Sequence, residues 1–247
     1  MNTKIYIAIP IHGRLKLAEE CVPTVFRGIG DGDTLAIYDD GTAEDNEGAW
    51  HTLENASNVL KRYLPLGIEA QRRTHFMDFA DRMDRAGWTH LYLTDADALH
   101  DPNWRSELLR IQASVGGAPV CGYNTKVHAD MLGNTIKEDG EVIWRRFAPG
   151  ISYLLTREHV EKVVQWLKAH PQRQHWDWDW SVPALLGYKF AVTKTSYVDH
   201  IGLGGMHHPA GEGYDGGDRA LNPTPAVAKL RAGIVGRLSD RDEPRHE

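Results

Sequence analysis

Three short apolar runs, each closed by a polar turn, constrain the fold of this chain most strongly. They are residues 4–9 (KIYIAI), 34–38 (TLAIY) and 89–93 (THLYL). Short β-branched runs that end at Gly, Pro or Asp are typical of buried strands. Strands that alternate with helices pair in parallel through right-handed crossovers. The pattern predicts a three-layer α/β/α sandwich with a mostly parallel central sheet.

The segments between these runs have the periodicity of amphipathic helices. Residues 15–27 carry one apolar face, although Pro23 predicts a kink or an early break. Residues 42–60 are predicted to be helical, with Thr42 as N-cap. A further helix is predicted over residues 71–85, where Gly87 ends the apolar periodicity.

The chain beyond Pro102 continues this pattern and then becomes less regular. We expect, in order, a helix over 104–114, a strand over 119–122, a hairpin over 133–147 turning at Asp139-Gly140, a strand over 151–155, a helix over 157–170, a short helix ending at Gly187, one or two strands up to Asp199, and a helix from Ala226. Residues 1–222 are predicted to form one domain, and residues 223–247 a C-terminal helix with a charged tail.

Composition and charge exclude several classes of protein. The chain of 247 residues has 28 basic and 34 acidic residues and a net charge of −6, with no basic run, so broad nucleic-acid binding by charge alone is not expected. No apolar stretch approaches the roughly 20 residues of a membrane span, and the start lacks a secretory layout. We therefore expect no membrane span and a cytoplasmic location. Cys21 and Cys121 lie in apolar runs without a CxxC pair and are predicted to be core residues.

Acidic residues follow two of the predicted strands. Asp95 and Asp97 come directly after the third run, where two carboxylates one residue apart can hold Mg²⁺ or Mn²⁺ beside phosphate oxygens. Asp39 and Asp40 end the second run and can accept hydrogen bonds from a ribose hydroxyl or a base N–H. Without its strand context, a DxD pair is more often a solvated acidic turn or a helix cap, and Asp39–Asp40 alone is equally consistent with an ordinary acidic turn. Ligands of open α/β sheets bind at the carboxyl ends of strands, so two acidic strand ends together favour a binding site.

The chain resembles family 2-type glycosyltransferases of the GT-A fold in the order of its motifs, which are IAIPIHGR, IYDDGT, a helix carrying QRR, LYLTDADALHDPNW, an acidic segment and SYVDHIG. The similarity covers most of residues 4–205. It implies the GT-A fold and the transfer of a sugar from a nucleotide-sugar donor, a UDP- or GDP-sugar, to an acceptor hydroxyl. It places the base and ribose against Pro10, Asp39 and either Arg72 or Arg73.

The same resemblance implies a metal site. Asp97 would bind the metal, and Asp95 would face the ribose or the metal. Many GT-A enzymes complete this site with a C-terminal histidine, here His200 in SYVDHIG, and a neutral imidazole suits Mn²⁺ better than Mg²⁺. A histidine that only bonds to backbone is the alternative, and His207 and His208 are rivals nearby.

The segment HWDWDW falls where the family carries its acidic base. Either Asp177 or Asp179 would take the proton of the acceptor hydroxyl in an inverting mechanism. The family's usual Glu-Asp pair is absent, so both remain candidates. The neighbouring tryptophans can stack on a sugar ring or pack in the core.

The glycine-rich residues 202–217 are interpreted either as a lid over the donor phosphates or as a linker to the last helix, with Arg219 just beyond them. The ending SYVDHIGLGGMHH…DRALNP resembles small phage-encoded glycosyltransferases. Their acceptors include virion proteins, surface glycans and modified DNA bases, and a phage enzyme would work in the host cytoplasm.

Two other functions are compatible with parts of the pattern. A nucleotidyltransferase or sugar-nucleotide pyrophosphorylase shares the carboxylate–metal chemistry, but it predicts a glycine-rich basic loop after the first strand, where this chain has only PIHGR. A carbohydrate-binding protein that uses the tryptophan cluster would not need carboxylates at strand ends.

Overall fold

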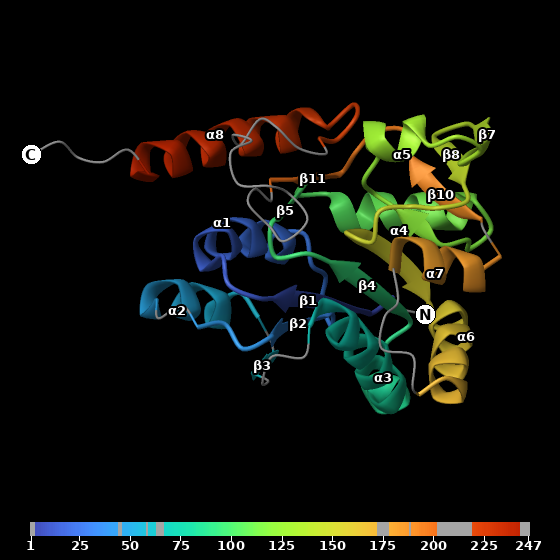
Figure 1. Cartoon of the computed structure of the whole chain (residues 1–247), viewed down its shortest axis with the longest axis horizontal. Coiled ribbons are helices and arrows are strands. Elements are labelled where there is room, and N and C mark those ends of the chain that lie inside the picture. Colours follow the sequence, from blue (N-terminus) through green and yellow to red (C-terminus); the bar gives the residue numbers. More distant parts are fainter. Residues whose placement is uncertain are drawn as a thin grey trace, which may run out of the picture.

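The computed structural model describes residues 3–43, 46–57, 59–62, 67–171, 178–187, 189–201 and 219–242. Within them a nine-stranded sheet has the order β3-β2-β1-β4-β9-β6-β10-β8-β7, and β11 forms a separate two-stranded sheet with β5. Figure 1 shows this sheet between helices, with the C-terminal helix across one end of the molecule. The predicted alternation of strands and helices in the N-terminal half is confirmed.

The strands are β1 (Ile5–Ile11), β2 (Thr34–Asp39), β3 (Val59–Arg62), β4 (His90–Thr94), β5 (Ala98–His100), β6 (Val120–Cys121), β7 (Thr135–Asp139), β8 (Val142–Arg145), β9 (Ser152–Thr156), β10 (Phe190–Thr193) and β11 (Val198–His200). The helices are α1 (Leu15–Phe26), α2 (Glu47–Asn55), α3 (Ile68–Ala86), α4 (Trp104–Ser114), α5 (Lys126–Asp130), α6 (Arg157–Ala169), α7 (Trp178–Leu185) and α8 (Pro225–Asp242).

The direction of the strands confirms a mostly parallel sheet. β3, β2, β1 and β4 are parallel neighbours, and β6 and β10 are parallel to each other. β9 lies antiparallel between β4 and β6, and β8 lies antiparallel between β10 and β7. Only β8 and β9 therefore run against the rest of the described sheet. The predicted hairpin is confirmed as β7 and β8, with Gly140 in the turn at φ 54°.

The side chains of β1 divide the core between the two faces of the sheet. Ile5, Ile7, Ile9 and Ile11 pack against α1, α2 and α4, whereas Tyr6 and Ala8 pack on the face that α3, α6 and α7 cover. Side chains alternate between faces along a strand, so a strand that is apolar at every position must be covered on both sides. The chain thus forms the predicted three-layer α/β/α sandwich.

The second predicted helix is shorter than expected, and its predicted N-cap is wrong. α2 begins at Glu47, and the side chain of Asn46 caps it by accepting from the backbone N–H of Ala49 at 3.1 Å. Thr42 belongs to the turn after β2, where its hydroxyl accepts the N–H of Gly13 at 2.9 Å. The end of the predicted helix is instead the edge strand β3. Pairing with β2 fixes this strand, and sequence periodicity over so few residues cannot show it.

Pro23 does not end α1, which continues to Phe26. Val22 before it and Val25 after it are buried, and the indole N–H of Trp104 donates to the carbonyl oxygen of Val25 at 3.1 Å. Tertiary packing therefore outweighs the local cost of proline here. Gly87 ends α3 as predicted, in the left-handed conformation at φ 71°.

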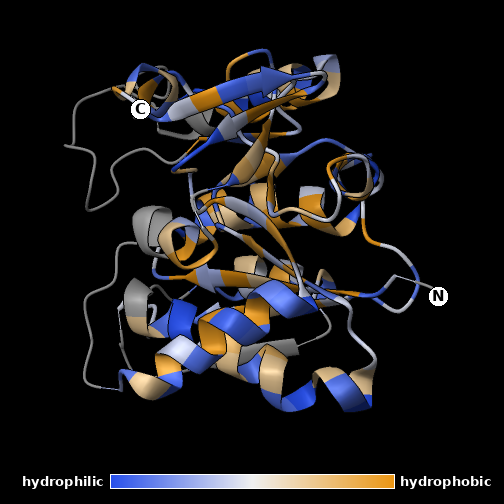
Figure 2. Cartoon of the chain, turned by 90° about the vertical axis from the view of Figure 1, so that its right-hand side faces the viewer, coloured by the Kyte–Doolittle hydropathy of each residue, from blue (hydrophilic) through white to orange (hydrophobic). Residues whose placement is uncertain are grey.

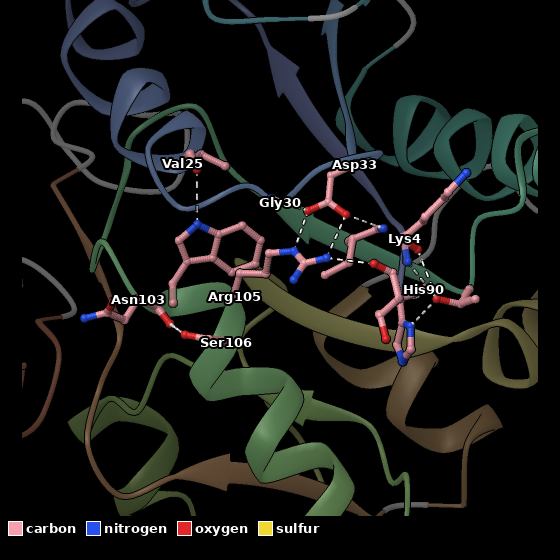
Figure 3. Close-up of polar contacts among 12 residues, drawn as sticks. Lys4, Val25, Gly30, Asp33, His90, Asn103, Arg105 and Ser106 are labelled. Carbon is pink, nitrogen blue, oxygen red and sulfur yellow. Dashed lines mark hydrogen bonds and ion pairs between the residues drawn. The ribbon is translucent and has the colours of Figure 1, made fainter. Parts of the chain in front are cut away.

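A buried carboxylate joins three segments at the edge of the sheet where the parallel strands begin (Figure 3). Asp33 accepts the N–H groups of Ile5 and Gly30, each at 2.8 Å, and pairs with the guanidinium of Arg105 in α4. Arg105 also donates to the carbonyl oxygen of Thr3 at 2.8 Å. This network stabilises the edge of the sheet opposite to the acidic strand ends.

The C-terminal helix α8 packs on the rest of the chain. Ile234 of α8 is buried with Leu17, Cys21, Leu99 and Ile201.

The structure confirms that Cys21 and Cys121 are buried free thiols. In Figure 2 the helices carry hydrophilic and hydrophobic residues side by side, as amphipathic elements do. Among the described residues, no helix has both the length and the apolar character needed to cross a membrane.

Candidate functional site

The carboxyl ends of β1, β2 and β4 lie side by side at one edge of the sheet. β1 is between the other two strands, with Ile11 opposite Asp39 in β2 and Ala8 opposite Leu93 in β4. Asp95 and Asp97 follow β4 directly, so this edge collects acidic residues from two neighbouring strands. Such an edge is where open α/β sheets bind ligands.

Asp97 contacts two cationic side chains from distant parts of the chain. Its Oδ1 lies 3.1 Å from Nε2 of His200, and its Oδ2 lies 2.8 Å from Nη1 of Arg14. The Asp97 side chain is only 5% exposed. The structure therefore brings the predicted metal ligands Asp97 and His200 together.

Strand pairing explains why His200 reaches Asp97. β5 follows the turn that contains Asp97, and it pairs antiparallel with β11 so that Ala98 lies opposite His200. The backbone N–H of Ile201 also donates to the carbonyl oxygen of Asp97 at 3.1 Å. Two backbone segments are thus fixed on either side of the carboxylate–imidazole contact.

The charges of this cluster favour an ionised Asp97. Burial alone would raise the pKa of Asp97, but the charge and hydrogen bond of His200, together with the charge of Arg14, outweigh burial and hold this pKa well below its usual value. Burial alone would lower the pKa of His200, but the Asp97 carboxylate outweighs it and raises this pKa. The site thus carries a buried negative charge that is compensated by neighbouring cations.

A second ion pair joins Asp95 to α3. Nη2 of Arg72 contacts Oδ1 of Asp95, and the Arg72 side chain is 5% exposed against 33% for Asp95. Nη1 of Arg72 is buried and has no hydrogen-bond partner among the described residues. The predicted donor-binding residues Arg72 and Asp95 are therefore neighbours, and Asp95 faces the more open side of the edge.

Asp39 and Asp40 are buried at the end of β2, and each uses one oxygen to fix a turn. Oδ1 of Asp39 accepts the N–H of Thr42 at 2.9 Å, and Oδ2 of Asp40 accepts the N–H of Gly67 at 2.8 Å. Pro10 is the neighbour of Tyr38 in the pairing of β1 with β2. All three predicted donor residues therefore lie at or next to the same strand ends.

The structure does not bring Arg73 to this edge. Its guanidinium donates to the carbonyl oxygen of Leu167 in α6 at 2.9 Å, so it links α3 to α6, and of the two predicted arginines only Arg72 contacts the acidic turn. Asp177 lies outside the described residues. Asp179 lies in α7, but its side chain is not among those described. His207, His208 and residues 202–217 lie outside the described residues, and Arg219 is exposed.

Arg14 and Arg231 contact this edge or the segment of His200, and Gln71 adjoins Arg72 in sequence; none of the three was predicted to be part of the site. Arg14 lies in the short loop PIHGR, and its contact with Asp97 joins segments far apart in sequence. Gln71 is 1% exposed, and neither polar atom of its side-chain amide has a hydrogen-bond partner among the described residues. Gln71 directly precedes Arg72, and the QRR motif is the only sequence signal that pointed toward it.

Arg231 of α8, the third such residue, fixes the segment that carries His200. Its Nη1 donates to Oδ2 of Asp199 at 3.0 Å and to the carbonyl oxygen of His200 at 2.8 Å. Oδ1 of Asp199 accepts the N–H groups of His200 and Ala220, at 2.9 and 3.0 Å. The C-terminal helix therefore contributes to the position of His200.

The residues at this edge fit a cation that is shared with a substrate. Among the described residues, no group of three or more His, Cys, Asp or Glu side chains is arranged to hold a metal ion. Mg²⁺ is commonly held by one or two carboxylates plus substrate phosphates, and Mn²⁺ accepts an imidazole as well. Asp97 and His200 provide such a pair, and the buried Oδ2 of Asp97 accepts no hydrogen bond from the described residues.

No protein-family model matches this chain, and no curated protein matches it in sequence. Its structure is similar to crystal structures of S. aureus TarS. TarS 1-349 superposes with a TM-score of 0.52 at 8% identity over 79% of this chain and 60% of that chain. The same fragment in complex with UDP superposes with a TM-score of 0.52 at 10% identity, over 79% of this chain and 60% of that chain. The fragment in complex with UDP-GlcNAc superposes with a TM-score of 0.51 at 9% identity, over 79% of this chain and 58% of that chain.

At this level of identity the likeness shows the fold alone. This chain spans about 60% of the TarS fragment and 36% of the longer TarS chain. The similarity confirms the fold class expected from the sequence: the chain has the GT-A type of three-layer α/β/α sandwich with a mostly parallel central sheet.

Proposed function

We propose that this protein is a metal-dependent glycosyltransferase, which moves a sugar from a nucleotide-sugar donor to an acceptor hydroxyl. The observation that carries the proposal is the contact of Asp97 with His200 at the carboxyl edge of the sheet, next to the ends of β1 and β2. TarS, which has the same fold, was crystallised with UDP and with UDP-GlcNAc. A UDP-sugar is therefore the first donor to test, and a GDP-sugar is the second.

Asp97 and His200 would hold Mn²⁺ or Mg²⁺ together with oxygens of the donor diphosphate. When bound, this cation supplies positive charge that stabilises the departing diphosphate. Asp95 is two residues before Asp97 and pairs with Arg72, and the buried Nη1 of Arg72 offers an N–H donor to the ribose or phosphate. Asp39 would accept a hydrogen bond from the nucleoside.

The transfer step needs a base on the acceptor side. In the proposed inverting reaction Asp177 or Asp179 takes the proton of the acceptor hydroxyl. The acceptor oxygen then forms a bond to the anomeric carbon, while the bond from this carbon to the diphosphate oxygen breaks. The products are the glycosylated acceptor and the nucleoside diphosphate.

The alternative functions are less compatible with the structure. The loop between β1 and α1 is short, because β1 ends at Ile11 and α1 begins at Leu15, so it cannot form the long glycine-rich loop of a nucleotidyltransferase. A protein that only binds carbohydrate has no use for a buried carboxylate paired with Arg14 and His200.

The nature of the acceptor is part of this proposal. A virion protein or a surface glycan is favoured over a modified DNA base, because the net charge of −6 opposes the approach of nucleic acid.

Turnover of nucleotide sugars tests the proposal. A panel of UDP- and GDP-sugars is incubated with the protein and Mn²⁺, and release of the nucleoside diphosphate is followed by mass spectrometry. We expect release from at least one donor, and we expect it to stop with a chelator and in Asp97→Asn. Asp139→Asn is the matched control, because Asp139 is an exposed carboxylate in the β7–β8 hairpin. Release that is equal in wild type and Asp97→Asn contradicts the proposal.

A further inference from the structure

Arg14 has a backbone conformation that is unfavourable for arginine. Its φ of 54° and ψ of 38° are left-handed, and Asn222 is the only other described non-glycine residue with positive φ. A side chain with a Cβ is strained there, and Gly or Asn is preferred. Arg14 is the N-cap residue of α1, but its side chain makes no capping hydrogen bond. Helix capping therefore does not explain an arginine at this position.

The guanidinium of Arg14 instead contacts Asp97. Nη1 lies 2.8 Å from Oδ2, yet this oxygen accepts no hydrogen bond from any residue that the structure describes, so the contact is an ion pair without a well-aligned N–H. The Arg14 side chain is 41% exposed, whereas that of Asp97 is 5% exposed. Because the guanidinium is partly solvated and no N–H is aligned on Oδ2, this contact can be exchanged for another partner of the carboxylate.

A divalent cation and Arg14 would compete for the same carboxylate. Oδ1 of Asp97 faces His200 and Oδ2 faces Arg14, so a cation held by this carboxylate and His200 would lie beside the guanidinium and compete with it for the negative charge of Asp97. The backbone of Arg14 stays fixed, because its carbonyl oxygen accepts the N–H groups of Leu17 and Ala18 at 2.9 and 3.1 Å. Once displaced, the guanidinium remains beside the cation, where a diphosphate would lie. Guanidinium groups bind phosphate oxygens through paired N–H donors.

We propose that Arg14 is the exchangeable counter-ion of Asp97 and a diphosphate-binding residue of the donor site. Before the donor binds, it compensates the buried carboxylate. When the cation takes its place on Asp97, the guanidinium binds the diphosphate. This inference rests on the proposed function, and it adds a donor-binding residue to that site.

Two binding constants, both measured by calorimetry, test the inference. The first is the affinity for Mn²⁺ alone, and the second is the affinity for UDP at saturating Mn²⁺. Arg14→Asn removes the charge and suits the left-handed backbone. We expect Arg14→Asn to bind Mn²⁺ several-fold more tightly, because the competing cation is gone. We expect it to bind UDP roughly tenfold more weakly, as the loss of a charge-assisted hydrogen bond predicts.

Two control variants separate charge from a general effect on the fold. Arg14→Lys keeps the charge and should keep the Mn²⁺ affinity of the wild type. Arg110→Asn removes an exposed arginine of α4 that pairs with Glu107 and Glu141, and it should change neither affinity.

The two opposite shifts are the signature of the proposed role. Weaker binding of both Mn²⁺ and UDP in Arg14→Asn would indicate a purely structural residue and overturn the inference. Equal Mn²⁺ affinity in wild type and Arg14→Asn overturns the inference and leaves the proposed function standing. Absence of Mn²⁺ binding from both proteins overturns the proposed metal site together with the inference.

Discussion

Nε2 of His200 lies 3.1 Å from Oδ1 of Asp97, although strands β6 to β10 separate the two residues along the chain. The pairing of β5 with β11 produces this contact. A site assembled in this way depends on the C-terminal part of the chain as much as on the acidic turn after β4.

Replacement of His200 should change the metal preference. Imidazole is a better ligand for Mn²⁺ than for Mg²⁺, so we expect His200→Ala to weaken Mn²⁺ binding by about tenfold or more and to affect Mg²⁺ less. Calorimetric titration with each metal in the presence of UDP measures the affinities for Mn²⁺ and for Mg²⁺. His170→Ala, at the exposed end of α6, should change neither. Equal losses for the two metals would argue against coordination by the imidazole.

Arg231 should stabilise both the fold and the position of His200. Arg231→Met leaves the carboxylate of Asp199, which is 2% exposed, without its cationic partner. Loss of one partner of a buried ion pair typically costs about 3 kcal/mol, so urea denaturation should show a lowered free energy of unfolding. The remaining folded protein should also bind Mn²⁺ more weakly. Arg237→Met, which removes an exposed pair with Glu20 on the same helix, should cost under about 1 kcal/mol. Similar losses in the two variants would contradict a special role for Arg231.

His100 should make the protein less stable in acid. Burial lowers the pKa of His100 to about 3 in the folded protein, against about 6.5 when unfolded. Between these values the unfolded chain binds the additional proton, so the free energy of unfolding falls as the pH drops from about 6.5 toward 3, by up to about 1.4 kcal/mol per pH unit.

Urea denaturation at a series of pH values measures this slope. His100→Gln should reduce it and leave the part that comes from His128 and His159, whose pKa values are each lowered to about 4, chiefly by burial. A slope that is unchanged in His100→Gln would show that His100 is not responsible.

Replacement by alanine should change the free energy of unfolding in opposite directions at two glycines. A Cβ on Gly28 would lie 2.4 Å from Nε1 of the fully buried Trp104, and overpacking of this kind costs about 1 to 3 kcal/mol. Gly48 lies in α2, where the nearest atom to an added Cβ is 3.6 Å away, and Gly48→Ala should add up to about 1 kcal/mol through helix propensity. Thermal unfolding of both variants tests the pair, and a stabilised Gly28→Ala would contradict the packing around Trp104.

The fold was predictable because the apolar runs of β1, β2 and β4 are uninterrupted and each ends in a polar turn. Local periodicity and turn residues determine such elements, and they also place Asp39 and Asp97 at strand ends. The edge strand β3 and the pair β5–β11 were not predictable in this way, because they are too short for a periodic pattern and depend on partners elsewhere in the sheet.

The same reason separates the predicted from the unpredicted site residues. His200 was found through a motif, whereas Arg14 and Arg231 act through contacts between distant segments that no local pattern encodes. Arg73 shares a motif with Arg72, but adjacent helix positions point in different directions, and the guanidinium of Arg73 donates to the carbonyl oxygen of Leu167 in α6.

Metal-dependent binding of UDP measures the central claim most directly. UDP is titrated into the wild-type protein and into Asp97→Asn, each with and without Mn²⁺, in a calorimeter. The structure predicts that the wild type binds UDP only when Mn²⁺ is present and that Asp97→Asn does not bind it under either condition. Binding of UDP to the wild type without any divalent cation, or undiminished binding to Asp97→Asn, would contradict a cation site at Asp97.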